Sequence, residues 1–216
     1  MKNPRRFILD NTVIMVPPHV PEIRLRLASE VHELWLKTEG ELEDIGVPPP
    51  FWAFAWAGGQ GLARYVLDHP TSVAGKRVVD FASGSGLVAI AAAKAGAIAV
   101  LAADIDPFSA IAVQLNSELN GVSVGFTGLD LMATIPDCDV LLAGDVFYDA
   151  EWAAALLPWF ERLDAAGITI LVGDPGRAYC PKERLERLAE YHVPVTRVLE
   201  DSEVKRTTVW RFVGSN

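Results

Sequence analysis

The sequence contains few residues that bind metals or form disulfides, which narrows the classes of protein that it can represent. These residues are Cys138, Cys180, His19, His32, His69 and His192. Two cysteines are too few for a disulfide framework, and they do not form a CxxC motif. The histidines are scattered without the spacing of metal ligands. We therefore expect no metal site and a reducing compartment, with the cytoplasm as the default.

The sequence also lacks a long apolar run and an excess of positive charge. No apolar run reaches the ~18 residues of a membrane-spanning helix. Lys2, Arg5 and Arg6 precede an apolar stretch, but Asp10 and Asn11 interrupt it, so we expect no secretory signal. Acidic residues outnumber basic ones, 28 against 19, and the formal net charge is -9. A field of that sign disfavours nucleic acids and anionic membranes as partners and favours basic ones.

The sequence does contain enough apolar residues for a packed core. Hydrophobic residues make up 50% and charged residues 22% of the 216 positions, which is typical of one globular domain. We divide this domain into an N-terminal extension over 1–60, packed on a core over 61–216. In the extension we expect two short strands around an Asp-Asn turn at 7–16, and an amphipathic helix at 24–43. That helix could serve packing alone or could help to close a site.

A strand, a tight turn and a helix follow one another at residues 78–96. Two β-branched residues lead into Asp80, small residues fill the turn, and a helix-forming run closes at Gly96. The start of such a helix points free N–H groups at any ligand that lies there. The next strand, 98–103, ends at Asp104, where an acid can accept both hydroxyls of a ribose. These features predict a site for a cofactor that contains a nucleoside.

The turn alone does not identify that cofactor. Gly84, Ser85 and Gly86 begin a G-x-G-x-x-A pattern, which also occurs in dinucleotide-binding proteins. Asp80 favours S-adenosylmethionine, because a carboxylate before the loop could reach an ammonium group but would repel a pyrophosphate. Ala82 at the first small position and the serine-rich turn favour the same cofactor. The alternative is an ordinary turn of a parallel sheet that binds no ligand.

A dense aromatic segment at 51–56 runs into glycines that precede a short helix at 62–67. Aromatic residues this dense usually belong to a core. Trp56 immediately precedes the glycines, which we expect to form a flexible turn just upstream of the cofactor strand. Trp56 could therefore either line the site or belong to the core.

Two further strands end at acidic residues. The strand at 122–126 is followed by Asp130, which is placed to meet an adenine amino group. The apolar strand at 140–143 leads into Asp145, and open α/β sheets bind ligands at the carboxyl ends of central strands. The other elements expected are helices at 107–119, 151–163 and 182–191, with a kink or break at Pro158, and strands at 168–172, 194–199 and 207–212.

The order of these elements predicts the fold class. The gap between the last two strands is too short for a crossover helix, so that pair should be antiparallel. Five parallel strands followed by an antiparallel pair suit a methyltransferase better than a dinucleotide dehydrogenase. We therefore predict an α/β fold with a Rossmann-like, seven-stranded methyltransferase sheet. This sheet is mostly parallel, ends in an antiparallel C-terminal pair, and carries helices on both faces.

The motifs resemble those of the lysine methyltransferases of the electron-transfer flavoprotein β subunit, within the seven-β-strand methyltransferases. The matching stretches extend over nearly the whole chain, at 50–60, 80–86, 103–107 and 173–179. Asp145 and Tyr148 are similar to the Asp-x-x-Tyr motif of related lysine methyltransferases. Ala82 departs from the wider superfamily, in which many members carry glycine at this position.

The resemblance implies transfer of a methyl group from S-adenosylmethionine to a protein lysine, with S-adenosylhomocysteine as product; we expect a monomeric enzyme. Positioning supplies most of the catalysis, because the sulfonium is already activated. The amine must be neutral to attack, and its deprotonation at pH 7 costs roughly 4–5 kcal/mol. A carboxylate favours the ammonium form, so Asp145 is assigned to aiming the lysine. The sulfonium charge and desolvation by Phe147, Tyr148 and Trp56 would favour the neutral form.

The predicted site residues fall into three groups. Asp145 and Tyr148 are the candidate catalytic residues. Phe147 and Arg177 are the candidate substrate contacts, although Arg177 could instead form a structural ion pair. The candidate cofactor contacts are Trp56, Asp80, Ala82, Ser83, Gly84, Ser85, Gly86, Asp104, Ile105, Asp130 and Asp145.

Three alternatives stay open. An NAD(P)-dependent oxidoreductase would need a proton donor beside the hydride site, and no Tyr-x-x-x-Lys arrangement occurs. A non-catalytic cofactor-binding module would not need Asp145 and Tyr148. Within the methyltransferases, a ribosomal protein or a small amine could replace the flavoprotein as substrate.

Overall fold

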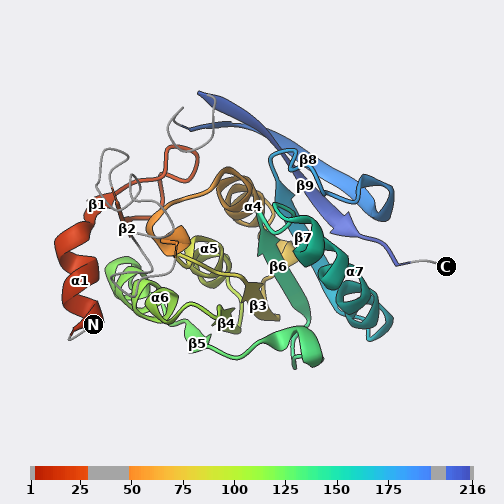
Figure 1. Cartoon of the computed structure of the whole chain (residues 1–216), viewed down its shortest axis with the longest axis horizontal. Helices are drawn as coiled ribbons and strands as arrows, with labels where there is room; N and C mark the ends of the chain where they lie inside the picture. Colours follow the sequence, from red (N-terminus) through yellow and green to blue (C-terminus); the bar gives the residue numbers. More distant parts are fainter. Residues whose placement is uncertain (1–2, 29–48, 196–202, 215–216) are drawn as a thin grey trace.

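The centre of the molecule is a seven-stranded sheet. Its strands are β3 (Arg77–Phe81), β4 (Ala99–Ala103), β5 (Gly125–Thr127), β6 (Val140–Gly144), β7 (Thr169–Asp174), β8 (Leu185–Pro194) and β9 (Val204–Phe212). The computed structural model describes residues 3–28, 49–195 and 203–214. The strand order is β5-β4-β3-β6-β7-β9-β8, and β9 is antiparallel to both of its neighbours while the others are parallel (Figure 1). The predicted fold class is confirmed.

Helices cover both faces of this sheet (Figure 1). They are α4 (Ala57–Asp68), α5 (Leu87–Lys94), α6 (Pro107–Asn120) and α7 (Ala150–Ala165). Successive strand residues point to opposite faces, so Val78 joins the buried cluster with α4 and α5, and Val79 joins the cluster with α7. Because both faces are covered, the central strands are mostly apolar, as parallel strands usually are, and their acids stand at or near their carboxyl ends.

The first predicted strand of the N-terminal segment is wrong. Residues 4–11 form α1 (Pro4–Asn11), and the Asn3 side chain caps it by accepting a hydrogen bond from the Arg6 N–H at 3.0 Å. A capping residue followed by proline is a helix-start signal, and it outweighs the β-like apolar run that follows. The helix packs its Phe7 ring on Phe108 of α6, with 5.5 Å between the ring centroids.

The second predicted strand exists, but its partner was not foreseen. Strand β1 (Val13–Met15) pairs antiparallel with β2 (Leu25–Leu27). Strand β2 occupies the start of the predicted amphipathic helix at 24–43, so that helix does not begin where it was expected. The rest of that prediction, from residue 29 on, lies outside the described residues.

The glycines that follow the aromatic segment do not form the predicted turn, because they belong to helix α4. A Cβ atom added at Gly58 would lie 2.4 Å from the Gly173 carbonyl oxygen and 2.5 Å from Asp145 Oδ2. One added at Gly61 would lie 2.4 Å from Thr207 Cγ2. Helix α4 therefore lies too close to the sheet to carry side chains at these positions. The glycines serve a close approach of backbones, not flexibility.

Helix α7 matches its prediction except at Pro158. It runs through Pro158 as one helix, with its N-terminus capped by Asp149, whose Oδ1 accepts a hydrogen bond from the Trp152 N–H at 2.9 Å. Pro158 lies on the exposed side of the helix. Proline has no N–H to donate to the backbone carbonyl one turn earlier in the helix. On the exposed side that carbonyl can bond to water instead, so the helix does not break there.

The helix predicted at 182–191 is wrong. Residues 182–184 form a short 3-10 helix, η4 (Lys182–Arg184), and strand β8 follows it directly. Strand β8 pairs with β9 from Leu185 to Pro194, with one irregularity between Arg187 and Ala189. Ladder formation along this edge outweighs the helix propensity of its Leu, Glu, Arg and Ala residues. The strand predicted at 194–199 overlaps β8 only at Pro194, and its residues 196–199 lie outside the described residues. The antiparallel pairing of the last two strands is confirmed.

We expect Gly58→Ala to destabilise the protein and Gly59→Ala to be tolerated. The added methyl at Gly58 would overlap the Gly173 carbonyl, and overpacking of this kind costs about 1–3 kcal/mol, or roughly 2–12 °C in the unfolding midpoint. At Gly59, the next residue of the same helix, the added methyl would meet only Val88 Cγ2 at 3.9 Å. Calorimetric unfolding of both variants measures the difference. Equal midpoints for the two variants would contradict the close approach.

Candidate active site

A cavity of about 710 Å³ lies at the carboxyl ends of β3, β4 and β6, beside the start of α4. This is the edge at which open α/β sheets bind ligands. All predicted site residues except Gly86 and Phe147 line the cavity, namely Trp56, Asp80, Ala82, Ser83, Gly84, Ser85, Asp104, Ile105, Asp130, Asp145, Tyr148 and Arg177. The fold therefore brings together side chains that are far apart in the sequence.

The loop between β3 and α5 is held by Asp104, at the end of the neighbouring strand. The Gly84 N–H donates a hydrogen bond to Asp104 Oδ2 at 2.8 Å, and the Asp106 N–H donates to Oδ1 at 2.9 Å. Each carboxylate oxygen can accept a further hydrogen bond, for which ribose hydroxyls are suitable donors. Ala82 has a φ of 53°, a conformation that favours glycine and explains why many related loops carry glycine here.

Asp80 is fully enclosed below that loop. Its Oδ2 accepts a hydrogen bond from the Ala89 N–H of α5 at 2.9 Å. The side chain of Asp80 thereby satisfies a free N–H at a helix start whose own capping residue, Gly86, supplies no side chain. Burial raises the pKa of Asp80 to about 8, and the charge of Asp104 adds to the increase. A cation beside Asp80 would offset this cost of burial.

The far end of the cavity presents exposed apolar side chains beside an acid. Ile105 and Leu129, which both line the cavity, are 69% and 72% exposed, so this end offers apolar surface that a ligand could cover. Asp130 lies beside Leu129, where its Oδ1 accepts a hydrogen bond from the Met132 N–H at 2.9 Å. Burial raises the pKa of Asp106, the capping residue of α6, to about 6. Leu129 was not predicted, and its only sequence signal is its position immediately before Asp130.

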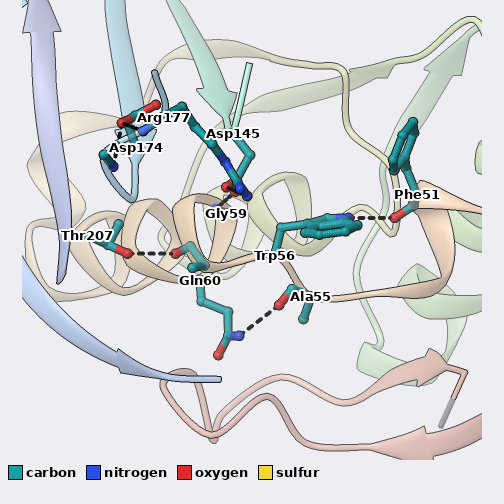
Figure 2. Close-up of polar contacts among 11 residues, drawn as sticks. Phe51, Ala55, Trp56, Gly59, Gln60, Asp145, Asp174, Arg177 and Thr207 are labelled. Atoms are coloured by element: carbon teal, nitrogen blue, oxygen red, sulfur yellow. Dashed lines mark hydrogen bonds and ion pairs between the residues drawn. The ribbon is translucent and has the colours of Figure 1, made fainter. Parts of the chain in front are cut away.

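Asp145 is the most constrained residue of the site (Figure 2). Its φ is 58°, in the left-handed region, and its N–H donates to the Gly173 carbonyl at 2.9 Å. Its Oδ2 accepts from the Gly59 N–H at 2.8 Å, and its Oδ1 accepts from Arg177 Nη2 at 2.7 Å. Because Gly58 has no Cβ, the carboxylate can reach the N-terminus of α4. The side chain is only 10% exposed.

Arg177 lies between Asp145 and Trp56. Its backbone N–H donates to Asp174 Oδ1 at 2.9 Å, and the Gly176 N–H donates to the same oxygen at 2.7 Å. Its guanidinium carbon lies 5.9 Å from the centroid of the Trp56 ring, within the range of a cation–π contact. The ion pair that was one of the two alternatives for Arg177 is therefore present. Arg177 also lines the cavity, and its contact with the substrate stays a prediction.

Three aromatic rings form the rim of the cavity. The Phe51 ring lies 5.9 Å from that of Trp56 and 6.1 Å from that of Tyr148. The indole N–H of Trp56 donates to the Phe51 carbonyl at 3.0 Å (Figure 2). Burial, with the charges of Asp149 and Asp104, raises the pKa of Tyr148, so its hydroxyl stays protonated and can donate a hydrogen bond. Phe51 was not predicted as a site residue, although it belongs to the aromatic segment that the sequence singled out.

Two predicted contacts do not reach the cavity. Gly86, with a φ of 78°, packs against α6, where an added Cβ would lie 3.0 Å from Val113 Cγ2. Phe147 is fully buried beneath α7, with its ring 6.3 Å from that of Phe160. The predicted substrate contact of Phe147 is therefore wrong, because the backbone after Asp145 turns this ring into the core.

Sequence reasoning missed Asn116, which connects the cofactor loop to the N-terminal segment. This side chain is fully buried in α6, where its amide N–H donates to the Ser85 carbonyl at 2.8 Å. Its carbonyl oxygen accepts from the Arg26 N–H of β2 at 2.7 Å. A polar residue on the apolar face of an otherwise buried helix was the available signal.

Within the part of the chain that the structure describes, no three His, Cys, Asp or Glu side chains group in a way that could hold a metal ion. Across those same residues, the search for a helix long and apolar enough to cross a membrane finds none.

Comparison with known proteins identifies the relatives of this chain. A family model described as ribosomal protein L11 methyltransferase (PrmA) matches residues 65–144. The chain is 41% identical to an electron transfer flavoprotein beta subunit lysine methyltransferase of Xenopus laevis, over 97% of this chain and 87% of the relative. The enzyme of the same name from Danio rerio is 38% identical, over 96% of this chain and 83% of the relative.

A solved structure supports the fold. The magnesium protoporphyrin IX methyltransferase of Synechocystis, determined with bound SAH, superposes with a TM-score of 0.52 at 16% identity, over 73% of this chain and 82% of that protein. Such low identity carries the fold alone. The two relatives named above are far more similar in sequence, over nearly the whole of this chain. The chain therefore belongs to the family of electron transfer flavoprotein beta subunit lysine methyltransferases.

Proposed function

We propose that this protein transfers a methyl group from S-adenosylmethionine to a lysine ε-amine of another protein, the electron-transfer flavoprotein β subunit. The observation that carries the proposal is the Asp145 carboxylate, fixed at the end of β6 in the same cavity as Asp80 and Asp104. The names of the relatives in Xenopus laevis and Danio rerio support both the reaction and the substrate.

The residues of the cavity fit S-adenosylmethionine along its length. Buried Asp80 suits the ammonium group, and Asp104 suits the ribose hydroxyls. The exposed side chains of Ile105 and Leu129 suit the faces of the adenine, with Asp130 near its amino group. When bound, the cofactor would supply a methyl group on a positively charged sulfur, which accepts the electron pair of the breaking bond.

The other end of the cavity suits a lysine side chain. The Asp145 oxygens accept from the Gly59 N–H and from Arg177 Nη2, and since a carboxylate oxygen can accept more than one hydrogen bond, an amine can be aimed without displacing the Gly59 N–H. The protonated hydroxyl of Tyr148 offers a further contact. The rings of Phe51 and Trp56 exclude water around the stem of the lysine. This arrangement works by positioning, as the reaction requires.

The alternatives of the sequence analysis receive less support. The match to the L11 methyltransferase model ends at residue 144, so it includes the cofactor loop but neither Asp145 nor Arg177. It therefore supports methyl transfer but not a ribosomal protein as substrate. The formal net charge of -9 suits a basic, lysine-containing partner. Cys138 and Cys180 are both unpaired, which supports the cytoplasm or another reducing compartment.

The direct test is incubation of the purified protein with labelled S-adenosylmethionine and purified electron-transfer flavoprotein, followed by mass spectrometry of the peptides. We expect methylated lysine on the β subunit. A parallel incubation with a cell extract would reveal a ribosomal or other protein as the substrate instead. Tight binding of NAD without binding of S-adenosylmethionine would contradict the whole proposal.

We expect Asp145→Asn to abolish most of the methyl transfer while S-adenosylhomocysteine affinity changes by no more than a few-fold. Asparagine tolerates the left-handed φ and can accept from the Gly59 N–H, but it lacks the negative charge. We expect a loss of at least about tenfold, as for removal of one charged hydrogen bond. The matched control is Asp149→Asn, which keeps the cap of α7 and should keep the rate. An Asp145→Asn enzyme with the wild-type rate would exclude Asp145 as the aiming residue.

We expect S-adenosylmethionine to bind more tightly as the pH rises toward about 8. The pKa of Asp80 is raised to about 8 in the free protein, and an ammonium group favours the ionised carboxylate, so binding below this pH releases a proton. Asp80→Asn should remove this pH dependence and weaken binding by about tenfold or more. Calorimetric titrations in two buffers of different ionisation enthalpy measure the affinity and the number of protons released. An unchanged pH dependence in the variant would assign the titration to another group.

We expect the same substitution to stabilise the ligand-free protein at higher pH. The folded-state pKa of Asp80 is raised to about 8, well above the ordinary value of an aspartate in an unfolded chain, so the protein loses stability as the pH rises from about 4 to about 8. Asp80→Asn should therefore have a higher unfolding midpoint than the wild type near pH 8, and a similar one near pH 4. Asp130→Asn, at an exposed position, serves as control and should show no such gain. A lower midpoint for Asp80→Asn near pH 8 would contradict the cost of burial.

A further inference from the structure

The carboxylate assigned to the lysine is not a bare anion. Arg177 Nη2 lies 2.7 Å from Asp145 Oδ1, and the side chains are 23% and 10% exposed. The Gly59 N–H, at a helix start, donates to the other oxygen at 2.8 Å. A nearby positive charge and a helix N-terminus both compensate the charge of a carboxylate. An amine that approaches Asp145 therefore meets a hydrogen-bond acceptor whose negative charge is largely balanced.

The position of Arg177 is built into the loop after β7. Asp174 is 1% exposed, and its Oδ1 accepts the backbone N–H groups of both Gly176 and Arg177. Burial, together with the negative charge of the nearby Asp174 carboxylate, raises the pKa of Cys180 to about 12, so the thiol keeps its proton. The Trp56 ring flanks the guanidinium. Arg177 is thus held by the backbone bond to Asp174, by the ion pair with Asp145 and by the Trp56 ring. These contacts suit it to remain in place when a lysine enters.

Several strands that end at the cavity carry a charged side chain at or just after that end. Among the described residues that line the cavity, Arg177 alone carries a positive charge. Asp149, next to Tyr148, and Asp174, which accepts the Arg177 backbone N–H, do not line the cavity, and Gly59, from α4, carries no charge. The other titratable groups that line it are Asp80, Asp104, Asp106, Asp130 and Tyr148. Without Arg177, the titratable groups that line the cavity would be carboxyls and the Tyr148 phenol, with no cation among them.

An acidic surrounding works against methyl transfer. A carboxylate beside an amine favours the ammonium form, and each unit by which the lysine pKa rises lowers the neutral fraction about tenfold near pH 7. A fixed cation has the opposite effect, because it favours loss of the ammonium proton to the solvent. The site thus needs a carboxylate to aim the amine and a cation to keep that carboxylate from retaining the proton.

We propose that Arg177 is a positioning residue that balances the charge of Asp145, so that the substrate lysine is held as a neutral amine. The inference rests on the proposed function. It adds an explanation of how a site that aims the lysine with a carboxylate can still hold that lysine uncharged. Arg177 does not itself touch the reacting atoms.

The test is the pH dependence of single-turnover methyl transfer to the flavoprotein β subunit, from about pH 7 to about pH 10.5. We expect Arg177→Gln to move the acidic limb of the rate profile upward by about one unit or more. Its rate should fall at least about tenfold near neutral pH and recover to within a few-fold of wild type at the alkaline end. Arg177→Lys keeps the charge and should keep the limb near its wild-type position.

The matched control is Arg184→Gln. Arg184 makes the same pair of contacts away from the cavity, with Glu161 Oε1 at 2.9 Å and the Phe212 ring centroid at 5.2 Å. This control should leave the limb unmoved. Calorimetry should give S-adenosylhomocysteine affinities within a few-fold of wild type for all three variants, and thermal unfolding confirms that each is folded. If Arg177→Gln does not fold, Arg177→Lys alone decides, since a limb shifted upward in that variant contradicts the inference.

The failures are distinguishable. A uniform loss of rate across the whole pH range in Arg177→Gln would show a structural role and overturn the inference. A higher rate or a lower KM for the protein substrate in this variant would show that lysine displaces Arg177, which also overturns it. A wild-type enzyme that binds S-adenosylmethionine but methylates no lysine of the β subunit would overturn the proposed function, and the inference with it.

Discussion

Two helices at the centre of the site begin without a capping side chain of their own, and aspartates from neighbouring strands take that place. Asp80, in β3, accepts the Ala89 N–H of α5, and Asp145, after β6, accepts the Gly59 N–H of α4. The second contact requires α4 to lie directly on the sheet, where a Cβ at Gly173 would be 2.1 Å from the Gly58 carbonyl oxygen. The same bonds that start these helices therefore fix the two carboxylates that face the ligands.

The charge of the cavity follows from this construction. Asp80, which caps α5 from the neighbouring strand, is buried, and burial raises its pKa to about 8. Burial also raises the pKa of Asp106, the N-cap of α6, to about 6. Such groups bind cations well and pyrophosphates badly, which favours a sulfonium cofactor with an ammonium group over a dinucleotide. The same acidity hinders the second substrate, since a lysine must be neutral to react. Arg177, held beside Asp145, answers this conflict without removing the carboxylate.

The parts of the molecule that were predicted correctly depend on local signals. The strand, loop and helix around Asp80 show β-branched residues, small residues and a helix-forming run, and α6 shows its start at Asp106 and its end at Gly121. The error at α1 concerned a local signal, Asn3 followed by proline, whereas other features that were missed depend on distant partners. Strand β8 has a helix-like sequence and is a strand because β9 lies beside it. The pairing of Asp145 with Arg177 joins residues 32 positions apart, and no local pattern distinguishes a paired from an unpaired carboxylate.

The strained backbone of the described residues lies at the cavity, where the charged side chains also gather. Across the described residues, the only non-glycine residues with positive φ are Ala82 and Asp145, and both line the cavity. They follow β3 and β6, which are neighbours in the sheet, with Phe81 paired to Ala143. Each strained residue costs on the order of 1–3 kcal/mol and persists only where its surroundings determine it. At Asp145 those surroundings are the Gly59 N–H, the Gly173 carbonyl and Arg177, so the contacts that hold the strain also aim the carboxylate into the cavity.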